Sequence, residues 1–335
     1  MWDSKWRQIL CDVVTTGNDV IRKDSTRNIK EHISYKFEIE DPRDRLLYDE
    51  TESLNIFQCI GHFLWITQGN FNLEAIQYYV PWVDALSSDD YKLIGAYGPR
   101  LFGIEHLNQI EHLLAVLDKD PSKRRAVASV YLPQFDQHGL ANEEIPCTLN
   151  LQYLVRNDKV QSLTYMRSQD ALKVLPYDVF IFTMLQEYVQ NRLKPKYDKF
   201  ELGKYNHFSG SFHVYHQDLE KVKKIISNKE TSTFKMPLMP HYDVKFRLQD
   251  MNKFESIVRT CVVAKIDHGV DIDFDSLFNM INNFLKEDYW KQFGYILLCY
   301  GAIKVKDAKN LQKAYDQLDK EYKRFVDLYN KKFKN

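Results

Sequence analysis

The sequence predicts an α+β protein in which a twisted mixed sheet carries flanking helices and a helical segment closes the chain. Apolar residues alternate with polar ones over residues 33–39, which is typical of a half-buried strand. Apolar residues recur at helical spacing elsewhere, most clearly over residues 54–68. Beyond about residue 240 the composition changes to Lys-, Asp- and Asn-rich amphipathic segments. These observations predict a mixture of strands and helices up to about residue 240 and only helices beyond it.

The first elements follow from periodicity and from the residues that end each run. Residues 1–17 predict a helix that packs on the domain, because four apolar residues recur near the 3.6-residue period: Trp2, Trp6, Leu10 and Val13. The strand over residues 33–39 is ended by Asp41-Pro42. The helix over residues 54–68 is followed by Gly69, a residue type that commonly ends helices.

The middle of the chain predicts a helix, a short strand and then a hairpin. A helix is expected from residue 104 to residue 117, and Asp120-Pro121 breaks the chain before an apolar strand at residues 126–132. Residues 148–155 and 160–166 form two further strand patterns around the turn pair Asn157-Asp158. A buried helix follows over residues 179–189, and residues 212–215 form a short strand.

The last part of the chain predicts a helical extension. A stripe of apolar and aromatic residues repeats there at alternating steps of four and three: Leu311, Tyr315, Leu318, Tyr322, Phe325 and Tyr329. Most such stripes pack on their own domain, and self-association or a lid role is the alternative. We therefore expect a catalytic domain at residues 1–240 and a helical C-terminal extension at residues 241–335.

Composition limits the kind of ligand and the setting. Forty-six basic residues balance 46 acidic ones, so no global field favours nucleic acid or an anionic membrane. The five cysteines are widely spaced, with no CxxC pair and no metal-ligand pattern, which favours a reduced, cytoplasmic protein without a metal site. The N-terminus lacks a signal-peptide core and no apolar run is long enough to span a bilayer. A small anionic ligand fits better than a polymer.

One stretch carries most of the chemical information. Residues 146–180 contain Pro146-Cys147, then Arg-Ser-Gln-Asp at residues 167–170, then Pro-Tyr-Asp at residues 176–178. A lone cysteine is usually an inert small apolar residue. This series, however, resembles the active-site core of the thymidylate synthase family. The resemblance covers roughly residues 20–220 and implies that fold, with two sheets packed face to face in a homodimer. It also implies that Cys147 attacks C6 of a pyrimidine nucleotide and that C5 then takes a one-carbon unit from 5,10-methylenetetrahydrofolate.

The same resemblance implies a phosphate site built from arginines, whose planar fork suits phosphate. Arg167 and Ser168 match the family's Arg-Ser pair, and Arg124-Arg125 match the paired arginines that a neighbouring subunit donates. Arg27 is similar to the phosphate-loop arginine, although Arg22 is near enough to leave that assignment open. Without the resemblance, the more common interpretation of Arg124-Arg125 is a pair of exposed arginines in a surface turn with no role in binding.

Asp178 bears on which base is bound. Thymidylate synthases carry asparagine at this position, and family members that act on cytosine nucleotides carry aspartate. A carboxylate cannot donate to O4 of uracil, but it accepts from the cytosine amine and can share a proton with N3. Such a site can discriminate between the bases by a factor on the order of 10⁴. A competing interpretation makes Asp178 a helix N-cap, since it opens an apolar run after a proline.

The remaining site residues are also assigned by resemblance. His213 and Tyr215 match a His-x-Tyr pair that hydrogen-bonds the sugar 3′-hydroxyl, and alternation puts both on one face. Trp82 and Asp170 match folate contacts, and Tyr97 matches an active-site tyrosine.

One catalytic position departs from the family. His62 stands where the family has a catalytic glutamate. An imidazole can move protons near neutral pH, or it can be an ordinary core residue in a site that has lost activity. The family's closing C-terminal tail is not recognisable.

Together these residues predict a cytidylate 5-hydroxymethylase, with dCMP favoured and CMP open. The rival enzyme is a methyltransferase that releases dihydrofolate, and the rival without chemistry is an inert nucleotide-binding relative.

Overall fold

A computed structural model of the chain describes residues 1–21, 27–52, 54–87, 89–103, 107–137, 144–228 and 234–333. The chain divides into two compact units that do not follow chain order: unit 1 comprises Met1–Leu54 with His106–Pro237, and unit 2 comprises Asn55–Glu105 with Leu238–Asn335. Residues 55–105, which we expected within a domain 1–240, thus group with the C-terminal helices. A single catalytic domain ending at residue 240 stays a prediction.

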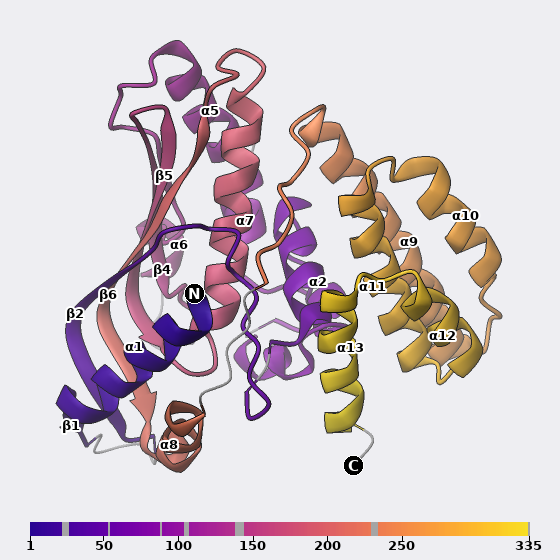
Figure 1. The fold of residues 1–335 in the computed structure, drawn as a ribbon, viewed down its shortest axis with the longest axis horizontal. Coiled ribbons are helices and arrows are strands. Elements are labelled where there is room, and N and C mark those ends of the chain that lie inside the picture. The colour runs from indigo at the N-terminus through magenta and orange to yellow at the C-terminus, as the bar shows by residue number, and fades with distance from the viewer. Residues whose placement is uncertain are drawn as a thin grey trace. The chain divides into compact units, whose positions relative to one another are not determined.

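Unit 1 is built on a six-stranded sheet of order β1-β2-β6-β5-β4-β3 (Figure 1). The strands are β1 (Asn18–Val20), β2 (Ile29–Ile39), β3 (Val127–Ser129), β4 (Thr148–Arg156), β5 (Lys159–Asp170) and β6 (Glu201–Tyr215). β5 and β6 run parallel and the other neighbouring pairs run antiparallel, so the predicted mixed sheet is confirmed. The predicted hairpin is also confirmed, because Asn157 and Asp158 join β4 to β5 with positive φ angles of 51° and 57°.

Helices pack on one face of this sheet. α1 (Trp2–Thr16) packs on β2 and β6, α5 (Gln109–Lys119) on β3, and α7 (Leu175–Leu193) on β5 and β6. α8 (Leu219–Ser227) packs on α1, and the unit also contains the short α6 (Pro133–Asp136) and η2 (His216–Asp218). Trp6 is fully buried, and its indole nitrogen donates to the Ala171 carbonyl oxygen at 2.8 Å. The predicted N-terminal helix therefore packs on its own unit, as expected.

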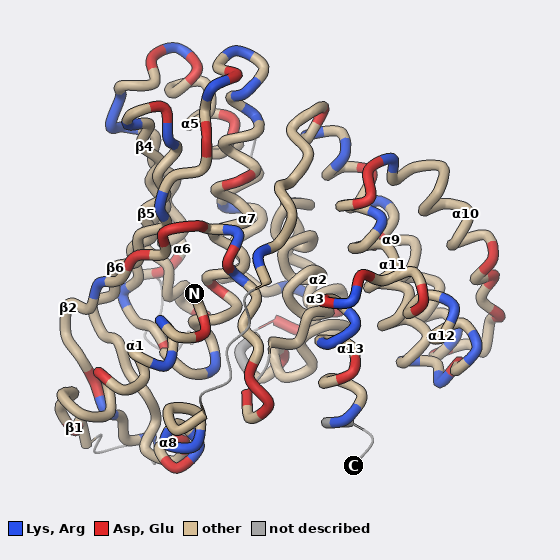
Figure 2. The backbone as a smooth tube through the Cα atoms, viewed as in Figure 1, with Lys and Arg blue, Asp and Glu red and all other residues tan. Residues whose placement is uncertain are grey.

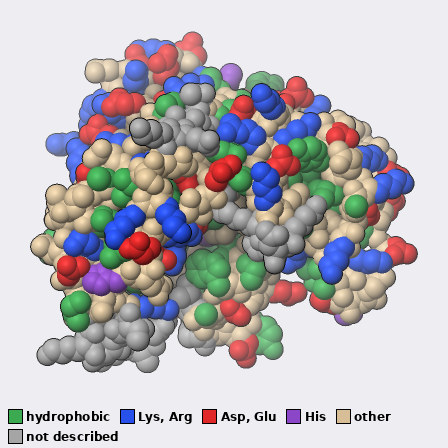
Figure 3. Space-filling view, turned by 60° about the horizontal axis from the view of Figure 1, so that its bottom comes forward, with side chains coloured by type: hydrophobic (Ala, Val, Ile, Leu, Met, Phe, Trp, Pro, Cys, Tyr) green, Lys and Arg blue, Asp and Glu red, His purple; other side chains and the backbone are tan. Residues whose placement is uncertain are grey.

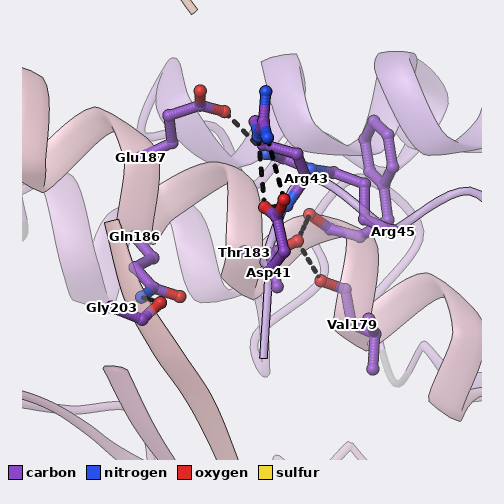
Figure 4. Close-up of polar contacts among 9 residues, drawn as sticks. Asp41, Arg43, Arg45, Val179, Thr183, Gln186, Glu187 and Gly203 are labelled. Atoms are coloured by element: carbon purple, nitrogen blue, oxygen red, sulfur yellow. Dashed lines mark hydrogen bonds and ion pairs between the residues drawn. The ribbon is translucent and has the colours of Figure 1, made fainter. Parts of the chain in front are cut away.

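α7 is buried along most of its length, so its polar side chains need internal partners. Gln186 Nε2 donates to the Gly203 carbonyl oxygen at 3.0 Å (Figure 4). The same nitrogen donates to the Val160 carbonyl oxygen at 2.9 Å, so this side chain ties the helix to both β6 and β5. Arg45 Nη2 donates to Glu187 Oε2 at 2.6 Å, and neither side chain is exposed. These contacts fix α7, whose first turn bears on the candidate site.

The opposite face of the sheet is only half-buried. Along β4, β5 and β6 the residues that alternate with the buried ones keep intermediate exposure. Several are large and apolar: Leu154, Leu163, Tyr165, Leu202 and Phe208. The Tyr165 and Phe208 rings stack with centroids 5.0 Å apart.

Unit 2 is helical. It contains α2 (Ile56–Thr67), α3 (Leu73–Gln77), η1 (Pro81–Leu86) and α4 (Tyr97–Phe102), then α9 (Val244–His268), α10 (Phe274–Phe284), α11 (Asp288–Lys304), α12 (Ala308–Asp316) and α13 (Lys320–Phe333). α2 packs on both α9 and α11. Buried Glu255 joins these segments, since it accepts from Tyr79 Oη at 2.9 Å and from Gln68 Nε2 at 2.9 Å.

Several predicted elements differ from the observed ones; the strand expected at residues 126–132, for example, is the three-residue β3. The strand expected at residues 212–215 is the end of the 15-residue β6. The helix expected from residue 104 begins at Gln109, and residues 104–106 lie outside the described residues. The C-terminal stripe is divided between α12 and α13, because the chain leaves the helix at residues 317–319.

Charged residues of both signs are interspersed along both units and over the face shown in space-filling view (Figures 2 and 3). Across the described part of the chain, no group of three or more acidic, histidine or cysteine side chains is arranged to hold a metal ion. None of the helices there combines the length and apolar character that crossing a bilayer requires.

Candidate active site

The strand register of unit 1 gathers the predicted residues at one end of the sheet. Ser168 pairs with Ser211 and Asp170 pairs with His213 across β5 and β6. Ile29, two residues after Arg27, pairs with Tyr215. Cys147 comes directly before β4, and its carbonyl oxygen accepts from the Arg167 amide at 2.8 Å. The ends of four neighbouring strands, β2, β6, β5 and β4, therefore lie together. They carry the residues that the sequence predicts as the nucleophile, the phosphate contacts and the sugar contacts.

Cys147 is half-buried, and Arg167 shapes its surroundings. Arg167 Nε donates to the Pro146 carbonyl oxygen at 2.9 Å, and Arg167 Nη2 donates to that of Ile145 at 2.7 Å. The guanidinium therefore pins the backbone ahead of the cysteine. Burial raises the pKa of the Cys147 thiol, the Arg167 charge opposes this rise, and the Asp178 charge adds to it. Since the thiolate is the nucleophilic form, Arg167 favours the reactive state.

Asp178 is the fourth residue of α7 and is 8% exposed. The N-cap of this helix is Val174, so the alternative that made Asp178 the cap is wrong. Its Oδ2 instead accepts from Gln169 Nε2 at 2.9 Å. Burial raises the pKa of Asp178 to about 7, with the Gln169 hydrogen bond lowering it and the Asp170 charge raising it. Near neutral pH both the protonated and the ionised form of this carboxyl are therefore populated.

The sugar and folate candidates of unit 1 lie beside each other. The His213 and Tyr215 rings meet edge to face with centroids 5.2 Å apart, so both side chains share one face as alternation predicts. Asp170 Oδ1 accepts from the backbone amides of Leu172 and Lys173 at 2.8 and 2.9 Å. Burial raises the pKa of Asp170, and these two amides and the His213 charge lower it. These bonds fix the Asp170 carboxylate at the turn that leads from β5 into α7.

The phosphate candidates are not all brought together. Arg27 is exposed at the sheet end just described, and Arg22 lies outside the described residues. Arg124 and Arg125 are exposed just ahead of β3, and the Arg124 carbonyl oxygen accepts from Gln152 Nε2 at 2.7 Å. Gln152 follows Cys147 by five residues, which is roughly 16 Å of strand at about 3.3 Å per residue. A single chain therefore does not bring this arginine pair to Cys147.

The other three candidates belong to unit 2. His62 is half-buried in α2, and its ring centroid is 5.9 Å from that of Trp65. Burial lowers the pKa of His62 to about 4, so the imidazole is neutral near pH 7. Tyr97 opens α4 and is half-buried, while the Trp82 side chain in η1 is 56% exposed. Their approach to Cys147 stays a prediction.

Sequence reasoning missed two contacts in this site. It gave Gln169 no role within the Arg-Ser-Gln-Asp motif, yet this side chain is 2% exposed and hydrogen-bonded to Asp178. It also assigned Arg167 to phosphate alone, without its bonds to the backbone ahead of Cys147. Neither contact has a local sequence signal, because each joins residues from different elements.

Comparison with known proteins decides the family. Residues 4–258 match the family model described as thymidylate synthase. The chain belongs to the thymidylate synthase family. The deoxyuridylate hydroxymethyltransferase of Delftia phage PhiW-14 is 27% identical over 253 residues, covering 71% of this chain and 67% of that protein. The protein of the same name from Bacillus phage SP01 is 26% identical over 276 residues, covering 75% and 71%. A putative thymidylate synthase of Methanocaldococcus jannaschii is 31% identical over 135 residues, covering 38% and 59%.

Family membership supports several predictions made from the sequence. The mixed α+β fold agrees with the thymidylate-synthase-like architecture. The chain is a one-carbon transferase of the thymidylate synthase type, acting at C5 of a pyrimidine nucleotide. Its one-carbon donor is methylenetetrahydrofolate. The names of the two phage relatives refer to deoxyuridylate, so these comparisons do not confirm the cytidylate prediction.

Proposed function

We propose that this protein is a cytidylate 5-hydroxymethylase that acts on dCMP in preference to dUMP, with CMP as the alternative cytidylate. The observation that carries the proposal is the Asp178 carboxyl, which is buried at the start of α7 and close enough to Cys147 to affect the pKa of the thiol. A buried carboxyl must find partners that suit it, and the amine edge of cytosine supplies a donor. The O4 and N3–H of uracil would leave an ionised Asp178 facing an acceptor.

The state of Asp178 also suits the chemistry. Addition of a thiolate to C6 becomes easier when N3 of the base receives a proton. A carboxyl with a pKa of about 7 can supply that proton at neutral pH and take it back when the cysteine is expelled. Cys147 would form the bond to C6, and the electron pair displaced from the C5=C6 bond would make C5 the carbon nucleophile.

The other residues would hold and orient the ligands. Arg167, Ser168 and Arg27 would bind the phosphate, and His213 with Tyr215 would bind the sugar 3′-hydroxyl. Methylenetetrahydrofolate supplies the one-carbon unit, and water completes the hydroxymethyl group before Cys147 leaves. The exposed Trp82 ring and the carboxylate of Asp170 are the kinds of groups that suit a folate, one as an aromatic face and one as an acceptor for pterin donors.

We further propose that a second copy completes the site. The half-buried apolar residues of β4, β5 and β6 form a face that a second sheet could cover, as in an interface between like subunits. The distance along β4 between Gln152 and Cys147 supports donation of Arg124 and Arg125 to the partner's phosphate rather than to their own.

The test is a substrate panel. The protein is incubated with methylenetetrahydrofolate and dCMP, CMP, dUMP or UMP, and products are identified by mass spectrometry. A 5-hydroxymethyl product from dCMP or CMP supports the proposal, and turnover of dUMP alone overturns it. Release of dihydrofolate, followed by absorbance, would indicate a methyltransferase instead. Nucleotide binding without exchange of the C5 hydrogen would indicate an inert relative.

A further inference from the structure

Gln169 forms a buried pair with Asp178, and the mechanism above gives a role to Asp178 but none to Gln169. Gln169 lies near the end of β5 and is 2% exposed, while Asp178 lies in the first turn of α7 and is 8% exposed. Gln169 Nε2 donates to Asp178 Oδ2 at 2.9 Å, and the same nitrogen is 3.4 Å from the Asp170 carbonyl oxygen. Because both neighbours of Gln169 Nε2 are acceptors, the side-chain amide must place its nitrogen there. The amide oxygen, Oε1, would be repelled at that position.

This contact makes the two carboxyl oxygens unequal. Oδ2 accepts a hydrogen bond from the amide, and a carbonyl oxygen accepts better than the oxygen of a protonated hydroxyl. A proton on the carboxyl is therefore favoured on Oδ1. When the carboxyl is ionised, the amide still stabilises the charge at Oδ2. Gln169 thus acts on both the position of the proton and the ease of losing it.

Gln169 Oε1 indicates which oxygen faces the amine of the base. This atom is buried and has no hydrogen-bond partner among the described residues. It belongs to the same amide that holds Oδ2, so two acceptors, Oδ2 and Oε1, lie at one side of the carboxyl. The cytosine amine has two N–H donors, which suit the two acceptors Oδ2 and Oε1. Uracil O4 is itself an acceptor and would be repelled by both. Oδ1 is then the oxygen that shares its proton with N3.

We propose that Gln169 is a positioning residue that sets selectivity for cytosine over uracil by holding Asp178 through Oδ2. The inference rests on the proposed function for its substrate. Several titratable groups act on or respond to the Asp178 carboxyl: Asp170 on β5, Cys147 ahead of β4 and Tyr205 on β6. Asp170 repels the ionised form, so Gln169 is the side chain that opposes both this repulsion and burial.

The test removes the donor while keeping the shape. Gln169→Met is close in length and cannot donate, and Gln169→Leu, which also lacks a donor and adds no charge, serves if the methionine variant does not fold. Gln190→Met is the matched control, since Gln190 is 3% exposed and donates one buried bond, to the Phe200 carbonyl oxygen at 2.7 Å. Each protein is labelled with ¹³C-aspartate, and the Asp178 carboxyl signal is identified by its loss in Asp178→Asn.

Without nucleotide, the midpoint of the Asp178 titration should rise by about one to two pH units in the Gln169 variants, the loss expected for a hydrogen bond to a charged group. It should not move in Gln190→Met. The ratio of kcat/KM for dCMP to that for dUMP should fall about tenfold or more in the Gln169 variants and stay constant in Gln190→Met. An unmoved midpoint, or a ratio that stays constant or rises in the Gln169 variants, would overturn the proposal.

The two readouts separate this inference from the proposed function. Wild-type protein that converts dUMP and not dCMP refutes the cytidylate proposal, whatever the Gln169 variants do. The titration of Asp178 in nucleotide-free protein still decides whether Gln169 controls the carboxyl.

Discussion

Replacing the Asp178 carboxyl should change how stability depends on pH. Burial raises its pKa from 3.8 to about 7 in the folded chain. The folded state then holds the proton more tightly than the unfolded state, so this group's contribution is fully present below about pH 4. The contribution is lost as pH rises to about 7. Roughly three pKa units at about 1.4 kcal/mol each give a total of about 4 kcal/mol. Between pH 5 and pH 8 the loss is about 2 to 3 kcal/mol.

Asp178→Asn removes this titration and keeps the shape of the side chain. Urea unfolding at pH 5, 6, 7 and 8 gives the free energy of unfolding for wild type and variant. The wild type should lose about 2 to 3 kcal/mol more than Asp178→Asn over this range, and Asp198→Asn, at an exposed position, should follow the wild type. Parallel curves for wild type and Asp178→Asn would refute the claim that the carboxyl is desolvated.

Four further outcomes are expected. Cys147→Ser should abolish product and C5 hydrogen exchange while nucleotide binding, measured by calorimetry, persists; unchanged turnover would remove the nucleophile. Arg167→Met should slow alkylation of Cys147 by iodoacetamide near pH 7, since the charge that lowers the thiol pKa is gone, and an equal rate would contradict that role. Inactive Cys147→Ser and Arg125→Ala proteins, mixed as refolded chains, should regain about a quarter of wild-type activity through hybrid dimers, whereas no recovery would argue against shared sites. Glu187→Leu should cost about 3–5 kcal/mol in urea unfolding because Arg45 is left buried and unpaired; partial recovery in Arg45→Met/Glu187→Leu would identify the cause, and a cost under about 1 kcal/mol would contradict it.

The sequence predicted those elements whose conformation is set by residues close together in the chain. The β4–β5 hairpin follows from Asn157 and Asp158, residue types that adopt positive φ more easily than most others. Helix α2 follows from its apolar spacing, and Gly69, with φ of +65°, comes just after the C-cap residue Gln68. The site residues of unit 1 were assigned by the resemblance of their motifs to those of the thymidylate synthase family.

Non-local pairing explains what the sequence did not predict. Residues 201–211 include two glycines and several polar side chains, a weak strand pattern, yet β6 lies between β2 and β5 and pairs with both. Helix α2 packs on α9 and α11, which follow it in the sequence by roughly 200 residues. The apolar periodicity of a helix does not show which distant helix it packs on. The bond between Gln169 and Asp178 likewise depends on how α7 meets β5.

A competition between the two bases tests the central claim most directly. Equal concentrations of dCMP and dUMP are supplied in one reaction with methylenetetrahydrofolate, and the two products are quantified by mass spectrometry for wild type and for Asp178→Asn. If the buried carboxyl selects the base, wild type yields 5-hydroxymethyl-dCMP in large excess and Asp178→Asn shifts the product ratio toward the uracil nucleotide. Excess uracil product from wild type, or an identical ratio in both proteins, would contradict the account.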